Sequence, residues 1–106
     1  MRIGINCGHT VSGQVGCGAV DYIDESVEAR NVGYALEDLL KKAGHTVYDC
    51  TNDYAPTVSS NLKQIVDMAN SQSLDLFVSI HFNSGGGRHA PHGACELKFV
   101  IALLFR

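Results

Sequence analysis

Three short apolar runs alternate with two helix-length amphipathic segments, and this order constrains the fold more than any other feature of the chain. The periodicity predicts strands at residues 2–7, 45–50 and 74–80, and helices at residues 26–43 and from about 60 to 71. A strand-helix-strand-helix-strand order is typical of an α/β sheet whose parallel strands are joined by right-handed crossovers. The predicted fold class is therefore α/β: a layered, mostly parallel sheet flanked by helices.

The first predicted helix has apolar residues at helical spacing and a clear stop signal. Its apolar positions are Val32, Ala35, Leu36, Leu39, Leu40 and Ala43. Gly44 follows them at the expected C′ position, directly after two lysines. Most of the charged residues in this segment, Arg30 and Glu37 among them, are expected on the opposite face of the helix.

The second predicted helix begins at a serine. Ser59 or Ser60 is the predicted N-cap, and the helix is expected to end near Ser71. Its apolar face is predicted to contain Leu62, Ile65, Val66 and Ala69.

Composition and charge narrow the class of protein. The chain has 106 residues, of which 45% are hydrophobic and 18% charged, as expected for one globular domain with a single core. Its net charge is −3 and its eight Lys and Arg residues are scattered, so we expect no nucleic-acid partner. The N-terminus opens on a strand-like run without a signal-peptide pattern, which predicts cytoplasmic synthesis.

The four cysteines, Cys7, Cys17, Cys50 and Cys95, are widely spaced and form no C-x-x-C pair. We interpret all of them as small buried or half-buried thiols rather than as zinc ligands or disulfides. Cys7 has an alternative role, because it lies two residues before His9. Positions two apart on a strand share a face, so a Cys7 thiolate could reach a metal bound by His9.

Two histidines follow predicted strands: His9 ends the run that contains the first strand, and His81 ends the third. Ligand sites in open α/β sheets form at the carboxyl ends of neighbouring strands, so two imidazoles there indicate a metal site. Hydrolytic zinc sites use three protein ligands and leave one position open, and two His with one Glu is a standard set. The two histidines therefore predict a carboxylate as the third ligand.

The carboxylates near the glycine-rich segment 8–24 are Asp21, Asp24, Glu25 and Glu28. Glu25 stands where this segment enters the first helix, so we expect its side chain to point toward the top of the sheet. Glu28, one turn further on, is the second choice. An equally compatible interpretation is that Asp24 and Glu25 are only the acidic residues favoured at a helix N-terminus.

Three segments together resemble the zinc-dependent N-acetylmuramoyl-L-alanine amidases, in particular the catalytic domains of phage endolysins and bacterial autolysins. The segments are Gly8-His9-Thr10; Glu25 with the later Lys42-Ala43-Gly44-His45-Thr46-Val47; and Ser79-Ile80-His81-Phe82-Asn83-Ser84. The resemblance covers residues 2–96. It implies an amidase-type fold with Zn²⁺ bound by His9, Glu25 and His81.

The resemblance implies a peptidoglycan substrate and hydrolysis of the amide between N-acetylmuramic acid and the L-alanine of the stem peptide, by a zinc-activated water. In the family a second glutamate on a late strand carries the proton. Glu96 is the one carboxylate after His81 in this sequence and is the candidate for that role. Asn83 and Arg88 are candidate substrate contacts.

Residues 97–106 form an atypical apolar tail that departs from the family pattern. We therefore interpret residues 1–106 as a single amidase-like catalytic domain truncated at its C-terminus, with little or no amidase activity. The run 99–105 is far short of the about 20 residues of a membrane span. It is expected to be a buried strand or a tail through which the protein self-associates.

Three alternatives remain at this stage. The chain is also compatible with a non-catalytic, zinc-containing wall-binding or regulatory fragment, and with a zinc peptidase that acts on another peptide. His89 and His92 are three residues apart and are compatible with a second metal site.

Because no signal peptide is visible, a wall hydrolase of this kind would reach its substrate after release by a phage pore or by lysis of a mother cell.

Overall fold

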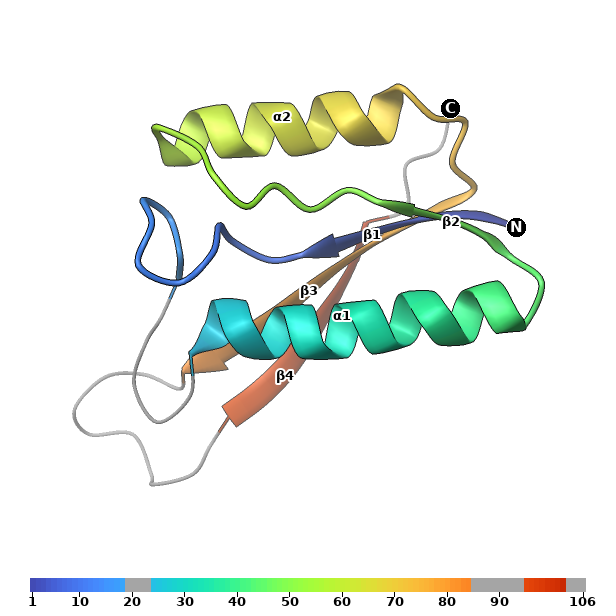
Figure 1. Cartoon of the computed structure of the whole chain (residues 1–106), viewed down its shortest axis with the longest axis horizontal. Helices are drawn as coiled ribbons and strands as arrows, with labels where there is room; N and C mark the ends of the chain where they lie inside the picture. The colour runs from blue at the N-terminus through green and yellow to red at the C-terminus, as the bar shows by residue number, and fades with distance from the viewer. Residues whose placement is uncertain (19–23, 85–94, 103–106) are drawn as a thin grey trace.

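The computed structural model describes residues 1–18, 24–84 and 95–102, which form a four-stranded sheet with helices on both faces (Figure 1). The strands β1 (Arg2–Cys7), β2 (Thr46–Asp49), β3 (Leu76–Ser84) and β4 (Cys95–Ala102) lie in the order β2-β1-β3-β4. β1 pairs in parallel with β2 and with β3, and β4 pairs antiparallel to β3. The α/β class with a mostly parallel sheet is confirmed.

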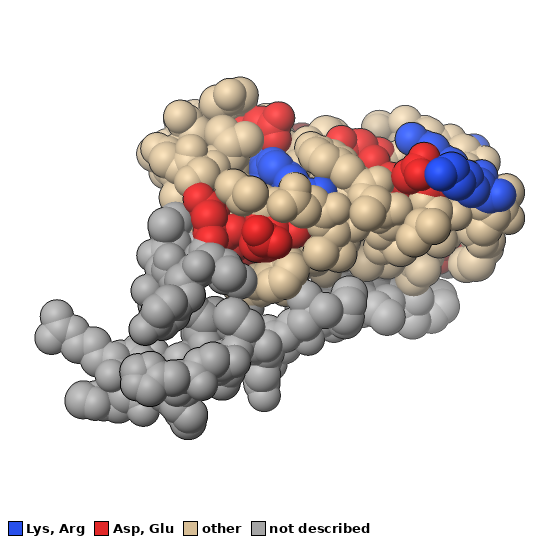
Figure 2. Space-filling model, turned by 60° about the horizontal axis from the view of Figure 1, so that its bottom comes forward, with Lys and Arg blue, Asp and Glu red and all other residues tan. Residues whose placement is uncertain are grey.

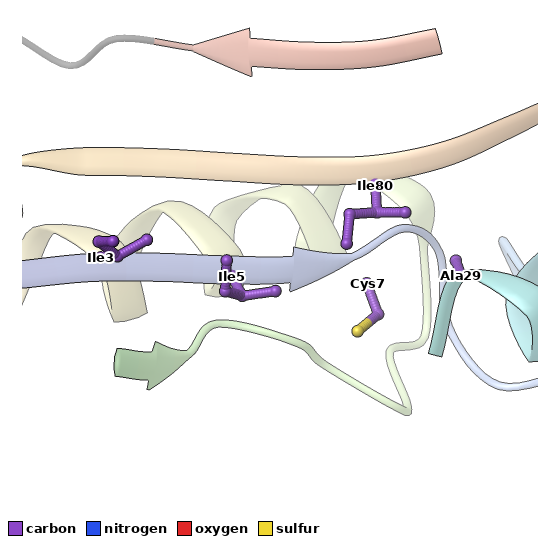
Figure 3. Close-up of a cluster of buried hydrophobic side chains, with 5 residues drawn as sticks. All are labelled: Ile3, Ile5, Cys7, Ala29 and Ile80. Carbon is purple, nitrogen blue, oxygen red and sulfur yellow. The ribbon is translucent and has the colours of Figure 1, made fainter. Parts of the chain in front are cut away.

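One face of the sheet packs against helix α1 (Glu25–Lys42) and holds the hydrophobic core (Figure 3). Alternate β1 residues Ile3, Ile5 and Cys7 point to this face, because strand side chains alternate between faces. They meet Ile80 of β3 and Ala29 of α1, and all five are at most 3% exposed. The helix therefore packs along β1 and β3, with its first turns near the carboxyl ends of these strands.

The ends of α1 follow the sequence signals closely. Asp24 is the N-cap, and its carboxylate accepts a hydrogen bond from the Val27 amide. At the other end Gly44 has a φ of 94°. The Gly44 amide donates to the Lys41 carbonyl and the His45 amide donates to the Leu40 carbonyl, both at 3.0 Å, which is the Schellman pattern. The predicted stop at Gly44 is confirmed.

The predicted buried face of α1 was partly wrong. Ala35 and Leu39 are exposed, Leu39 by 63%. Glu37, expected on the solvent face, is only 8% exposed, and the Arg30 side chain is only 11% exposed. The fully buried residues of α1 are three small ones and two glutamates: Glu25, Ser26, Ala29, Gly33 and Glu37. Small side chains let the helix approach the sheet closely, and the predicted Val32, Leu36 and Leu40 pack beside them as partly buried residues.

Helix α2 (Val58–Asn70) lies over the opposite face of the sheet from α1 (Figure 1). Its N-cap is Thr57, whose hydroxyl oxygen accepts from the Ser60 amide at 3.0 Å, so the predicted caps Ser59 and Ser60 were wrong. The predicted end at Ser71 is confirmed, since Ser71 is the C-cap.

The apolar face of α2 is only partly buried. Ile65 and Ala69 are buried as predicted, whereas Leu62 and Val66 are 57% and 53% exposed. Together with Val58 they border a groove of about 550 Å³ that also reaches Phe77 on β3. The groove also reaches His9 and His81 at the carboxyl ends of the strands.

Strand β3 extends beyond its predicted end at residue 80. It continues to Ser84, because β4 supplies an antiparallel partner: Asn83 pairs with Glu96 and Ser84 with Cys95. The predicted strand end at residue 80 was therefore wrong. Residues 85–94 lie outside the described residues.

Charge and hydropathy complete the description of the fold. On the face in Figure 2, acidic and basic residues lie near one another, and the described residues of this face form no continuous basic stripe. Neither helix in the described part of the chain is long and apolar enough to cross a bilayer.

Candidate metal centre

The carboxyl ends of β1 and β3 and the start of α1 bring His9, Glu25 and His81 together. His9 Nε2 lies 2.9 Å from Glu25 Oε1, and His81 Nδ1 lies 3.2 Å from His9 Nε2 and 3.3 Å from Glu25 Oε1. Among the described residues, these three form the group of His, Cys, Asp or Glu side chains whose ligand atoms lie close enough together to hold a metal ion. The predicted set of two His and Glu25 therefore converges at one point.

The donor set and its spacing fit a zinc ion. Ligand atoms about 2.0–2.2 Å from a tetrahedral zinc lie roughly 3.3 Å apart, close to the three separations observed. The two imidazole rings are nearly perpendicular, at 87°, so their nitrogens approach one point from different directions. Glu25 is 8% exposed and the two His side chains about 30% exposed, which leaves the imidazole side of the site open to a fourth ligand.

Two glycines allow the ligands to approach. A Cβ on Gly8 would lie 2.6 Å from His81 Nδ1, and a Cβ on Gly18 would lie 2.7 Å from both Glu25 Oε2 and His9 Cδ2. Gly18 also has a φ of 82°, a conformation that side-chain-bearing residues rarely adopt. Any larger residue at either position would displace a predicted metal ligand.

Arg30 supports the backbone around His9. His9 has a φ of 67°, the left-handed region that non-glycine residues seldom occupy. Arg30 Nη2 donates to the His9 carbonyl at 3.2 Å and to Asp53 Oδ1 at 2.8 Å. Its Nη1 donates to the Ser26 hydroxyl at 2.7 Å and approaches the Gly8 carbonyl at 3.5 Å. One guanidinium thus connects the turn at His9 to the first turn of α1.

A second set of hydrogen bonds supports His81 from the side away from His9. His81 Nε2 lies 3.1 Å from Ser79 Oγ. The Ser79 hydroxyl donates to Asn6 Oδ1 at 2.7 Å, and Asn6 Nδ2 donates to the Cys50 carbonyl at 3.0 Å. The Asn6 residue is 4% exposed and Ser79 is half-buried, and both line the groove beside α2.

The structure separates the other carboxylates near α1 from the ligand cluster. Glu28 is not part of it. Asp24 caps the helix and accepts a hydrogen bond from the Ser12 hydroxyl, which is the main cause that lowers the pKa of its carboxyl. The helix-start interpretation is therefore correct for Asp24, whereas Glu25 reaches the histidines. Asp21 lies outside the described residues.

Cys7 does not join the cluster, contrary to the alternative that a shared strand face suggested. The chain turns at His9, so Cys7 and His9 no longer follow strand alternation, and Cys7 lies in the α1-facing core (Figure 3). Burial raises the pKa of the Cys7 thiol, and it raises the pKa of Cys50 to about 11. Both groups are thiols at neutral pH and not the thiolates that metals bind, and Cys7, Cys17 and Cys50 form no disulfide.

The remaining candidate residues lie where side chains are not described. The backbone of Glu96 pairs with Asn83 across β4 and β3, and both side chains lie outside the described part of the structure. Arg88, His89 and His92 lie outside the described residues. Their predicted roles therefore stay predictions.

Comparison with known proteins identifies the family. A sequence model described as N-acetylmuramoyl-L-alanine amidase matches residues 3–96, a range that contains all three converging side chains. The chain belongs to this amidase family. The resemblance inferred from His9, Glu25 and the segment around His81 is confirmed.

Two curated proteins are similar to this amidase-family chain. An uncharacterised protein of Clostridium perfringens (strain 13 / type A) is 36% identical over 89 residues, which are 84% of this chain and 25% of that protein. An uncharacterised 38.4 kDa protein of Clostridium perfringens is 37% identical over 83 residues, which are 78% of this chain and 23% of that protein. This amidase-family chain spans about a quarter of the length of the curated relatives it matches.

Sequence reasoning missed the residues that support the ligands: Arg30, Asn6 and Ser79. Asn6 and Ser79 did carry a signal, because each is a polar residue inside an apolar strand, and Ser79 lies two positions before His81 on the same strand face. No sequence signal indicated a supporting role for Arg30, because a charged residue on an amphipathic helix is normally assigned to the solvent face.

Proposed function

We propose that this chain is a zinc-dependent N-acetylmuramoyl-L-alanine amidase domain with peptidoglycan as its substrate. It would hydrolyse the amide between N-acetylmuramic acid and the L-alanine of the stem peptide. The observation that carries the proposal is the convergence of His9, Glu25 and His81, within the segment that matches the amidase family.

In this proposal His9, Glu25 and His81 hold the zinc ion. Bound zinc supplies Lewis acidity, which activates water and polarises an amide carbonyl. The half-exposed imidazoles leave room for substrate, whereas the buried Glu25 balances charge beneath the site.

The proposal assigns proton transfer and substrate contacts to residues near the end of β3. Glu96 is the candidate proton carrier, and the Glu96 backbone lies opposite Asn83, two residues beyond His81. Asn83 and Arg88 are the candidate substrate contacts. Since the family resemblance places the principal catalytic glutamate on a later strand, Glu96 acts as its substitute in this proposal. We propose that the protein acts on the cell wall.

Zinc content tests the ligand assignment. Wild-type protein and the variants His9→Ala, Glu25→Ala and His81→Ala are purified in the same way, and bound zinc is measured by mass spectrometry. Glu28→Ala is the matched control, because it removes a glutamate from the same first turn of α1. We expect about one zinc per chain in the wild type and the control, and almost none in the three ligand variants. Equal zinc in all five proteins would refute the site.

Product analysis tests the reaction. Zinc-loaded protein is incubated with purified cell walls, and three products are measured: new L-alanine amino termini, reducing sugar and released C-terminal amino acids. Any amidase activity would give only the first product, and Glu96→Ala would abolish it if Glu96 carries the proton. Release of C-terminal amino acids would instead indicate a zinc carboxypeptidase. Sedimentation with walls but no cleavage would indicate a zinc-containing wall-binding fragment.

A further inference from the structure

A continuous chain of hydrogen bonds connects a backbone carbonyl to the ring of His81. It runs from the Cys50 carbonyl to the Asn6 amide, then to the Ser79 hydroxyl, and ends at His81 Nε2, with distances of 3.0, 2.7 and 3.1 Å. Asn6 and Ser79 are direct partners in the parallel register of β1 and β3. The sheet itself therefore holds the two middle members side by side.

The direction of every bond in this chain follows from its first member. A carbonyl oxygen only accepts, so the Asn6 side chain must turn its NH₂ toward Cys50 and its oxygen toward Ser79. The Ser79 hydroxyl has one hydrogen, and the Asn6 oxygen takes it. Ser79 can then only accept from His81, so His81 Nε2 must carry a hydrogen.

This direction decides which His81 nitrogen is free to bind a cation. In the neutral ring, a hydrogen on Nε2 leaves a lone pair on Nδ1. Nδ1 is the atom that faces the other two proposed metal ligands, at 3.2 Å from His9 Nε2 and 3.3 Å from Glu25 Oε1. Partners that bind the second nitrogen of a metal-ligating histidine are known to fix its tautomer and ring orientation.

We propose that Asn6 and Ser79 are positioning residues that hold His81 in the Nε2–H tautomer and present its Nδ1 to the metal. The proposal rests on the zinc site proposed above. Neither residue is among the three proposed zinc ligands. Asn6 orients Ser79, and Ser79 orients the imidazole through the nitrogen that points away from the cluster.

The first measurement is the zinc affinity of the whole chain, with Zn²⁺ alone as the probe and a chromophoric chelator as competitor. We expect Ser79→Ala to weaken zinc binding about 10- to 100-fold, the range seen when such outer partners are removed. Ser79→Thr keeps the hydroxyl and is expected to stay within a few-fold of wild type. Ser71→Ala is the control, because the Ser71 hydroxyl bonds the Met68 carbonyl at the far end of α2. Wild-type affinity in Ser79→Ala would overturn the proposal.

The second measurement is the tautomer of His81 in the metal-free protein, read from the ring ¹⁵N chemical shifts in NMR spectra above the histidine titration range. The proposal requires a hydrogen on Nε2 in wild type and in Ser79→Thr, with a mixed population in Ser79→Ala and in Asn6→Leu. A hydrogen on Nδ1 in the wild type would overturn it. Absence of zinc binding by the wild type would instead refute the proposed function, and the NMR spectra would still decide the role of Asn6 and Ser79.

Discussion

At the residue scale, His9 is a proposed metal ligand that also has an unfavourable backbone conformation. A non-glycine residue in the left-handed region costs about 1–3 kcal/mol and persists only where its surroundings hold it. Here the surroundings include Arg30, which bonds the His9 carbonyl and is itself oriented by Asp53. The same turn breaks strand alternation and sends the imidazole toward Glu25 and His81.

Arg30→Lys is expected to weaken both the turn and zinc binding. A lysine has one point charge and no planar fork, so it cannot bond the His9 carbonyl, Ser26 and Asp53 together. We expect a loss of about 1–3 kcal/mol in unfolding free energy, measured by urea denaturation, and roughly tenfold weaker zinc binding. Lys42→Ala removes an exposed cation from a pair with Asp38 and serves as control. Unchanged zinc affinity in Arg30→Lys would show that the turn holds without the guanidinium.

The buried carboxyl of Glu37 should make the free energy of unfolding depend on pH. Its Oε1 is buried and has no hydrogen-bond partner among the described residues. Burial, reinforced by the charge of Asp49, raises the pKa of its carboxyl. Because the folded-state pKa lies above the unfolded value, Glu37 stabilises the fold fully below the unfolded pKa and loses this contribution as pH rises through the folded pKa.

Glu37→Gln removes this titration, so the two proteins should diverge with pH. From about pH 4 to about pH 7 we expect the wild type to lose unfolding free energy relative to the variant, because only the wild-type carboxyl gains a buried charge. Urea denaturation at several pH values measures the difference, and Asp38→Asn, at an exposed site, is the control. A constant difference across this range would contradict the prediction.

At the element scale, the fit of α1 onto β1 depends on Gly33. A Cβ at this position would lie 2.2 Å from Cys7 Sγ and 3.5 Å from Ile80 Cδ1. The small residues Ala29 and Gly33 thus set how near α1 approaches the sheet. The position of Glu25, the first residue of the same helix, depends on this approach.

The substitution Gly33→Ala tests this close contact between α1 and β1. Alanine favours a helix by about 1 kcal/mol over glycine, yet overpacking a tight core costs typically about 1–3 kcal/mol. We expect net destabilisation in thermal unfolding, and partial recovery in the double variant Gly33→Ala with Cys7→Ala, because the smaller side chain makes room for the new methyl group. A Gly33→Ala protein more stable than wild type would show that helix propensity outweighs the contact.

At the scale of the whole molecule, the outer strands of the described sheet differ. β2 has four residues and β4 has eight. A long edge strand presents unpaired backbone groups that another chain can join, whereas a short one presents few. The apolar sequence at residues 99–105 lies partly within β4, so this edge is where we expect self-association.

Size-exclusion chromatography with light scattering over a range of concentrations measures this association. We expect dimers or larger species in the wild type, and a shift toward monomer in Val100→Lys, because a lysine on an edge strand opposes pairing with another chain. Val66→Lys places the same charge on the exposed face of α2 and is the matched control. A monomer at all concentrations would contradict the prediction.

The sequence by itself determined the order of the first five elements, the end of α1 at Gly44 and the types of the side chains predicted to bind a metal. These follow from local periodicity, from turn chemistry and from histidines near strand ends, which neighbouring residues decide. Tertiary structure decided that Glu25 and not Glu28 meets the histidines, that Glu37 and Arg30 turn inward, and that β3 continues past His81 beside β4. Each of these depends on how closely a helix packs or on which strand lies alongside, and such contacts join residues far apart in the chain.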